Sequence, residues 1–166
     1  MMDNLTSLSS KNLLALYRRV MDELRGREIT RSSNNPVADY SEFLFCLAFG
    51  WSREANSKAG FDALDGDVRY QIKGRRPTKH NPSRQLSAIR KMEGNPFDFL
   101  AGVIFDEDFG VFRAALIPLS IVRGRARKSS HVNGWLFNLD DAVWQLSGVT
   151  DVTEHLRRAQ SHAKHG

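Results

Sequence analysis

The stretch RYQIKGRR, residues 69–76, places side chains that could bind a metal ion or a phosphate on one side of a predicted β-strand. Gln71 and Lys73 alternate with the apolar Tyr70 and Ile72, a pattern typical of a half-buried strand. Successive side chains of a strand point to opposite faces, so Gln71 and Lys73 share one face. That face meets either plain water or a bound anion.

Two carboxylates are predicted to join this pair. Asp62 lies on the preceding strand of a predicted hairpin, and Glu42 lies inside a largely apolar helix, where a charge needs a partner. Asp62, Gln71, Glu42 and the Ile72 carbonyl would offer the hard oxygen ligands that suit Mg²⁺. Lys73 beside such an ion could orient an attacking water and offset charge that develops on a phosphate.

The stretches ADYSEFL, KAGFDALDGD and YQIKGR together resemble the PD-(D/E)XK nuclease superfamily, in a variant with Gln71 in place of the commoner acidic residue. The resemblance covers roughly residues 36–117 and implies a restriction-endonuclease-like core. It further implies metal binding by Asp62, Gln71 and Glu42, and a catalytic role for Lys73. The implied activity is Mg²⁺-dependent cleavage of DNA in restriction, phage defence or repair, with Mn²⁺ as a possible substitute. A homodimer would be compatible with cutting both strands.

Basic residues surround this candidate site, and the chain carries a formal net charge of +5. No acidic residue interrupts the stretch from Arg69 to Lys91, and a second basic stretch follows residue 122. Such stretches attract phosphates, so nucleic acid is the expected partner. The candidate nucleic-acid-binding residues are Arg75, Arg76, Lys79, Arg84, Gln85, Arg127, Lys128 and His131.

Several other interpretations stay open at this stage. Glu42 could be a core carboxylate that pairs with an arginine, and Gln71 and Lys73 could form the solvated side of an edge strand. Asp62 could be a turn residue, with Asp65 as the nearest substitute ligand. The whole protein could also be a nuclease fold that binds nucleic acid without cutting it.

A further alternative is a protein-interaction module. Its exposed surface would be formed by three aromatic residues near the C-terminus, Trp135, Phe137 and Trp144.

The elements that must position these residues follow from periodicity and caps. We expect an α/β domain with a mixed sheet flanked by helices. The predicted helices are 5–25 as an amphipathic packing helix, 36–49, 81–92, 118–125 and a last helix that reaches about 160. The predicted strands are 61–64, 68–75, 97–105 and 111–117. The domain is expected to span residues 1–166, with a C-terminal helical and basic extension from 118 to 160.

Composition excludes some classes of protein. The single cysteine, Cys46, lies in an apolar run and permits no disulfide within the chain, so it is expected to pack in the core. No uncharged apolar stretch is long enough to cross a bilayer, and no signal pattern opens the sequence. We therefore expect a cytoplasmic protein that does not bind a membrane.

Overall fold

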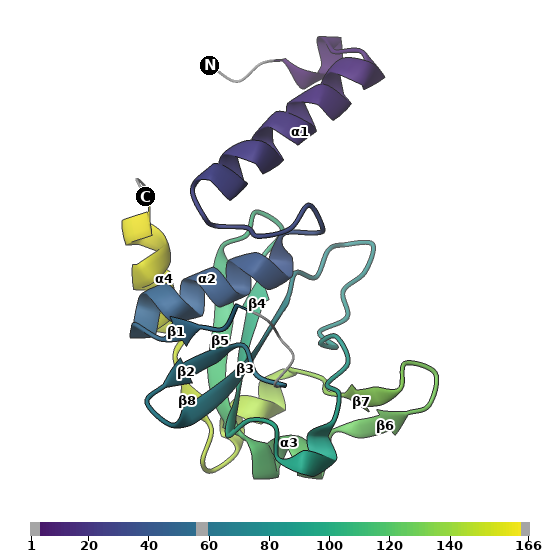
Figure 1. Cartoon of the computed structure of the whole chain (residues 1–166). Helices are drawn as coiled ribbons and strands as arrows, with labels where there is room; N and C mark the ends of the chain where they lie inside the picture. Colours follow the sequence, from purple (N-terminus) through teal and green to yellow (C-terminus); the bar gives the residue numbers. More distant parts are fainter. Residues whose placement is uncertain (1–3, 56–59, 164–166) are drawn as a thin grey trace.

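The centre of the computed structural model, which describes residues 4–55 and 60–163, is a six-stranded mixed β-sheet (Figure 1). The strand order is β1-β2-β3-β4-β5-β8, in which β3 and β4 are parallel and all other neighbours are antiparallel. The strands are β1 (Ser52–Arg53), β2 (Ala63–Asp65), β3 (Val68–Arg75), β4 (Phe99–Phe105), β5 (Val111–Pro118) and β8 (Thr150–Asp151). The predicted α/β class with a mixed sheet flanked by helices is confirmed.

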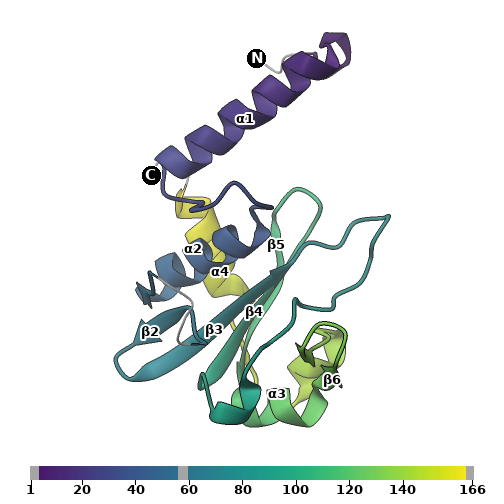
Figure 2. The same cartoon turned by 45° about the vertical axis from the view of Figure 1, so that its right-hand side comes forward.

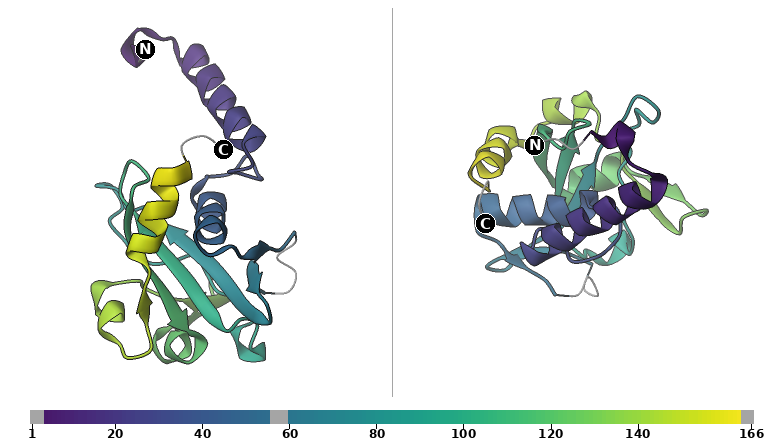
Figure 3. Two further views of the ribbon diagram at one scale, coloured as in Figure 1. Left: turned by 90° about the vertical axis from the view of Figure 1, so that its left-hand side faces the viewer. Right: turned by 90° about the horizontal axis from the view of Figure 1, so that it is seen from above.

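Two helices, α2 (Val37–Phe49) and α4 (Thr153–His162), cover one face of the sheet and lie side by side (Figure 3). The residue directly before α2 is Pro36 rather than the predicted cap Asn35, although the Asn35 side chain accepts a hydrogen bond from the Val37 N–H at 3.0 Å. Apolar side chains of α2 pack with those of β3, β4 and α4 into the first core cluster. Its fully buried members include Leu44, Phe45, Ala63, Ala101, Val103, Ala114 and Leu156.

The opposite face of the sheet is covered by α3 (Leu119–Arg125), by short 3₁₀ helices and by the segment that connects β3 to β4 (Figure 2). The 3₁₀ helices on this face are η3 (Met92–Gly94) and η4 (Asp141–Gln145). A separate two-stranded ribbon of β6 (Arg127–Ser129) and β7 (Gly134–Leu136) projects beyond them. These elements bury the second core cluster, so the sheet has a core on each face.

The predicted helix 81–92 is wrong, because this part of the chain is extended and only η3 follows it. The apolar residues that suggested a helix, Leu86, Ile89 and Met92, are indeed buried. They are held by backbone contacts with the ribbon region: Leu86 N–H donates to Phe137 O at 3.0 Å, and Ile89 exchanges two hydrogen bonds with Trp135. Long-range pairing therefore replaced the local helical hydrogen bonds.

The N-terminal helix has different bounds from those predicted and does not pack as expected. A 3₁₀ turn, η1 (Leu5–Ser7), precedes α1 (Ser10–Gly26), which begins after the Ser9 side chain caps the Asn12 N–H. Helix α1 projects away from the sheet (Figures 1 and 3), and four of its large apolar side chains are exposed. The exposed residues are Leu13, Leu14, Tyr17 and Val20. No helix in residues 4–55 and 60–163 is long and apolar enough to span a membrane.

The tryptophans do not form the exposed interaction surface considered above. Phe137 is fully buried, while Trp135 and Trp144 are half-buried and pack against the second core cluster. The interpretation that used these three rings as an exposed patch is therefore wrong. One side of each indole takes part in the core.

Helix α2 approaches β3 unusually closely at Gly74. A Cβ atom built on Gly74 would lie 1.9 Å from Ser41 Oγ, 3.1 Å from Ser41 Cβ and 3.3 Å from Val37 Cγ1. The Ser41 hydroxyl is itself buried and donates to the Val37 carbonyl at 2.6 Å. Any side chain at residue 74 would therefore push the start of α2 off the sheet. This contact fixes the position of the helix that carries Glu42.

Candidate functional site

Asp62 lies immediately before β2 with its side chain directed at the neighbouring strand β3. One carboxylate oxygen, Oδ2, accepts a hydrogen bond from the Ile72 N–H at 2.7 Å and another from the Gln71 side-chain amide. The residue is only 8% exposed, and burial raises the pKa of the carboxyl group against the lowering effect of these hydrogen bonds. The second oxygen, Oδ1, has no hydrogen bond from the described residues.

Among residues 4–55 and 60–163, no strand pairs with β3 beyond Tyr70 on the edge that faces Asp62. In the described part of the chain, the pairing of β2 with β3 ends at the Ala63–Tyr70 pair. The N–H and C=O groups of one strand residue point to the same edge of the strand. Because the Ile72 N–H reaches Asp62, the Ile72 carbonyl faces this edge as well. We call the region around Asp62, Gln71 and the Ile72 carbonyl the open edge.

Lys73 lies on the same side of the sheet as Asp62. Tyr70 and Ile72 are buried in the first core cluster, so Gln71 and Lys73 point to the other face. Lys73 Nζ donates to Ser87 Oγ at 3.0 Å and to the Ala88 carbonyl at 3.2 Å. Burial lowers the pKa of the ammonium group, and the nearby Asp62 charge opposes that effect. Asp62, which bonds to Gln71, and Lys73 therefore lie toward the same face of the sheet.

Glu42 is a core carboxylate that pairs with an arginine, and it also senses the charge of Asp62. Its Oε2 accepts a hydrogen bond from Arg53 Nε at 2.7 Å, so it is a core carboxylate paired with an arginine. Burial raises its pKa, and the negative charge of Asp62 raises it further. The second acid near Arg53 is Asp39, whose Oδ1 lies 3.6 Å from Nη2. Glu42 is thus paired, and it is also an electrostatic neighbour of the open edge.

The oxygens at the open edge match the preferences of Mg²⁺ in type. They are the second Asp62 carboxylate oxygen and the Ile72 carbonyl oxygen, while the Gln71 side chain turns its amide nitrogen toward Asp62. Mg²⁺ usually takes few protein ligands and keeps several waters. Residues 4–55 and 60–163 contain no group of three or more His, Cys, Asp or Glu arranged to hold a metal ion. A cation at this place would therefore depend on Gln71 and Ile72 as well as on the acids.

Most of the predicted nucleic-acid-binding residues also make contacts within the protein. Arg75 Nε donates to the Ser83 carbonyl at 2.9 Å, and the Arg76 guanidinium stacks over Phe109 at 4.7 Å. The backbone N–H of Lys79 donates to the Glu107 carboxylate at 2.8 Å, so the Lys79 ammonium group takes no part in that hydrogen bond. These contacts position the start of the β3–β4 connection.

Ser83 to Gln85 belong to the extended segment that replaces the predicted helix 81–92, so they offer a phosphate no N–H groups of a helix start. Gln85 instead forms a β-bridge with Asn138. Arg127, Lys128 and His131 are exposed on the ribbon. The ribbon therefore offers the most accessible of the predicted basic residues.

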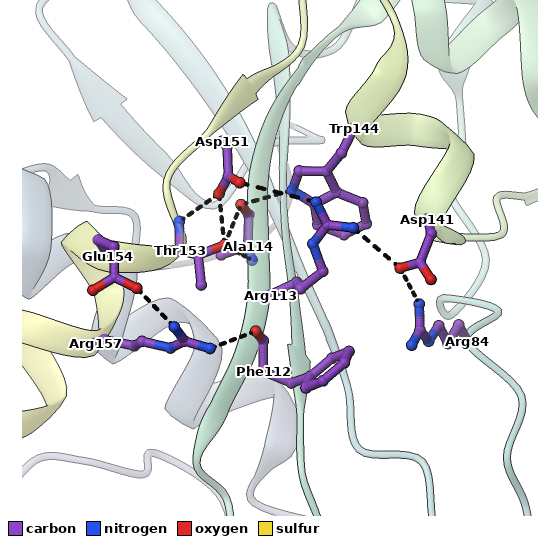
Figure 4. Close-up of polar contacts among 10 residues, drawn as sticks. All are labelled: Arg84, Phe112, Arg113, Ala114, Asp141, Trp144, Asp151, Thr153, Glu154 and Arg157. Carbon is purple, nitrogen blue, oxygen red and sulfur yellow. Dashed lines mark hydrogen bonds and ion pairs between the residues drawn. The ribbon is translucent and has the colours of Figure 1, made fainter.

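An ion-pair network that the sequence did not suggest holds the extended segment over the sheet (Figure 4). Asp141 accepts hydrogen bonds from Arg84 Nη1 at 2.7 Å and from Arg113 Nη1 at 3.1 Å, and the Arg113 guanidinium lies 4.0 Å from the ring centre of Trp144. Arg113 Nη2 also lies 3.9 Å from Asp151. The network joins β5, the C-terminal region and the segment that carries the Lys73 partners.

Sequence reasoning also missed Arg53 and the Lys73 partners Ser87 and Ala88. Arg53 follows the buried helix by only a few residues, but nothing in its neighbourhood indicates which acid it pairs with. Ser87 and Ala88 have no side chain that signals a catalytic role. These contacts form because the β3–β4 connection packs against the sheet, and no local pattern in the sequence indicates that packing.

Searches of protein family models and of curated protein sequences found no match to this chain.

Proposed function

We propose that the protein is a Mg²⁺-dependent DNA endonuclease of the PD-(D/E)XK type. The observation that carries the proposal is the convergence of Asp62, Gln71, the Ile72 carbonyl and Lys73 at the open edge of β3. The Asp62 carboxylate contacts the Gln71 amide group, and Gln71 and Lys73 share one face of the sheet, an arrangement that supports hydrolysis of a phosphodiester. A bound Mg²⁺ would supply charge stabilisation of the phosphate and activation of water.

Each residue of the site has a distinct role in this proposal. Asp62 Oδ1, the Gln71 amide oxygen and the Ile72 carbonyl would hold the cation, while Asp62 Oδ2 would stay bonded to the Ile72 N–H of β3. Lys73 would orient the attacking water and neutralise charge on the phosphate, and its Ser87 and Ala88 contacts limit where the ammonium group can go. Glu42 contributes negative charge from α2.

A second candidate, a nucleic-acid-binding protein that does not cut, is favoured by one observation. Arg53 already pairs with Glu42, so the second carboxylate is compensated without a metal ion. In that case basic side chains would still bind DNA, and binding would fall with salt but not with EDTA.

The test is cleavage of plasmid and linear DNA in Mg²⁺, Mn²⁺ or EDTA. We expect the wild type to cut in either metal and not in EDTA, and Asp62→Ala and Lys73→Ala to lose cleavage while thermal melting shows that they fold. Matched controls are Asp67→Ala in the β2–β3 turn and Lys11→Ala on α1, which should retain full activity. Equal cleavage by all five proteins would identify a contaminant. Salt-dependent binding without cleavage would favour the second candidate.

A further inference from the structure

A basic hollow lies between the end of the β3–β4 connection and the β6–β7 ribbon. Its volume is about 350 Å³, and its walls include Arg90, Lys91, Lys128, Glu93 and Trp135. Three cationic side chains and one carboxylate give it a positive balance. We call it the ribbon hollow. It shares no residue with the open edge of β3.

The backbone around the ribbon hollow is held firmly in place. Ile89 and Trp135 exchange two hydrogen bonds of 2.8 Å, so the extended segment and the ribbon form one surface. Gly134 permits this approach, since a Cβ at that residue would lie 2.9 Å from the Ile89 carbonyl. Lys91 adopts a left-handed conformation with φ 55°, which turns the chain at the wall of the hollow.

The Trp135 indole forms a flat and oriented wall of this hollow. Its Nε1 donates to Glu93 Oε1 at 3.1 Å, and one part of the ring packs against the second core cluster. Lys128 Nζ lies 5.7 Å from the ring centre and 3.7 Å from Glu93 Oε1. An aromatic surface next to several cations can bind a ligand that has both a π-face and a phosphate.

The ribbon hollow is a neighbour of the candidate catalytic lysine. Lys73 Nζ bonds to the carbonyl of Ala88, the residue before the one that pairs with Trp135. The charge of Arg90 also reaches Lys73, because it lowers the lysine pKa in addition to the larger effect of burial. A nucleic-acid strand whose phosphate lies at Lys73 would therefore pass close to the hollow.

We propose that the ribbon hollow binds one unpaired nucleotide of a DNA strand, with the base stacked on Trp135 and its phosphate near Lys128, Arg90 and Lys91. This inference rests on the proposed function, because it places the nucleotide beside the phosphate to be cut. It gives Arg90 and Lys91 of the basic stretch a defined place of contact, and it adds a stacking role for Trp135 that the sequence patterns did not indicate. A stacked base would make the protein prefer single-stranded or frayed DNA over an intact duplex.

The test is binding of a fluorescein-labelled oligothymidylate of eight nucleotides, followed by fluorescence anisotropy in EDTA, so that no cleavage is needed. We expect Trp135→Leu to weaken binding about tenfold and Trp135→Phe to retain most of it, because a phenyl ring still stacks. Binding should quench tryptophan fluorescence in the wild type, and the quenching should be lost in Trp135→Phe.

The charge-matched control is a lysine remote from the hollow. Lys128 in β6 lines the hollow, whereas Lys11 is exposed on α1 and is not among the residues of its walls. Lys128→Gln should reduce the slope of log affinity against log salt by about 0.7, whereas Lys11→Gln should leave it nearly unchanged. Thermal melting checks the fold of every variant.

Three outcomes would overturn the inference. These are equal losses from Lys128→Gln and Lys11→Gln, unchanged binding by Trp135→Leu, or equally tight binding of inorganic polyphosphate, which has no bases. The proposed function can fail separately. Trp135-dependent binding by a protein that never cuts DNA would support nucleotide binding in the ribbon hollow and contradict the nuclease proposal. Cleavage without Trp135-dependent binding would support the nuclease proposal and contradict nucleotide binding in the hollow.

Discussion

The substitution Gly74→Ala tests whether the contact between α2 and β3 positions the candidate site. The added methyl group would lie 1.9 Å from Ser41 Oγ, roughly 1.5 Å closer than ordinary van der Waals contact allows. Helix α2 cannot easily move away, because Leu44 and Phe45 of the same helix are fully buried in the core. The clash must therefore be relieved at Ser41 or by a shift of the helix.

Both routes have an estimated cost. Rotation of the Ser41 hydroxyl would break its hydrogen bond to the Val37 carbonyl and leave a buried polar group unsatisfied, at about 1–3 kcal/mol. Even then Ser41 Cβ would lie 3.1 Å from the new methyl group, and overpacking costs about 1–3 kcal/mol. We expect Gly74→Ala to lower the free energy of unfolding by about 3 kcal/mol. The melting temperature should fall by about 6–12 °C for a domain of this size.

Urea denaturation of a double-mutant cycle measures this directly. Ser41→Ala removes the Oγ atom, so it should recover about half of the loss caused by Gly74→Ala, with a coupling energy of about 1–2 kcal/mol. Gly124→Ala is the matched control, because a Cβ there meets no atom within 4 Å and the residue is helical. It should be neutral or slightly stabilising. Additive effects of the Ser41 and Gly74 substitutions, or a Gly74→Ala protein as stable as the wild type, would refute the reasoning.

Three further predictions concern single charged or reactive groups. Arg53→Met should lower the free energy of unfolding, measured in urea, by about 3 kcal/mol, because it leaves Glu42 unpaired at a site where the arginine side chain is only 12% exposed. Arg53→Lys should lower the free energy of unfolding by less. An Arg53→Met protein as stable as the wild type would contradict the pairing. As the pH rises above 3.8 through the raised pKa of Asp62, the Asp62→Asn protein should become more stable relative to the wild type, because burial penalises the ionised carboxylate. The measurement is the free energy of unfolding in urea at several pH values. A difference between the two proteins that stays constant with pH would argue against this reasoning. Burial raises the pKa of the Cys46 thiol from 9.0 to about 11. At pH 8, iodoacetamide should therefore alkylate the folded protein about 100-fold more slowly than the urea-unfolded protein, as followed by mass spectrometry. Similar rates of alkylation would contradict the burial of the thiol.

The elements that carry the open edge were predictable because their local signals agree with their tertiary contacts. The alternation in residues 68–75 gave the correct strand, and the cap at Asn35 marked the start of α2 within one or two residues. The shared face of Gln71 and Lys73 follows from the two-residue period alone. The predicted hairpin is present, but β2 spans Ala63–Asp65 rather than the predicted 61–64, so Asp62 precedes the strand and Asp65 ends it.

The β3–β4 connection was not predictable in the same way. Leu86, Ile89 and Met92 recur at a helical spacing, and the burial that this spacing indicates is correct. The backbone is extended because residues 135–137, far along the chain, provide its hydrogen-bond partners. One sequence without relatives contains no signal for such a pairing. The Lys73 contacts with Ser87 and Ala88 were hidden for the same reason.

The amphipathic pattern of α1 shows a different limit. Its apolar stripe predicted a packing helix, yet Leu14 is 70% exposed, and only Met21 among the helix residues is buried. Periodicity reports that a face is apolar, but it does not identify what covers that face. The helix is correct as an element and wrong as a part of the domain core.

The electrostatics of the open edge connect stability to the proposed chemistry. Burial raises the pKa of both Asp62 and Glu42, and the charge of Asp62 adds to the effect on Glu42, so the two ionised carboxylates oppose folding at neutral pH. Arg53 compensates Glu42 by a direct hydrogen bond, whereas Asp62 relies on neutral donors and on the charge of Lys73. A divalent cation bound at Asp62 would remove this penalty. Mg²⁺ should therefore stabilise the wild type more than Asp62→Asn at neutral pH, whether or not DNA is cut.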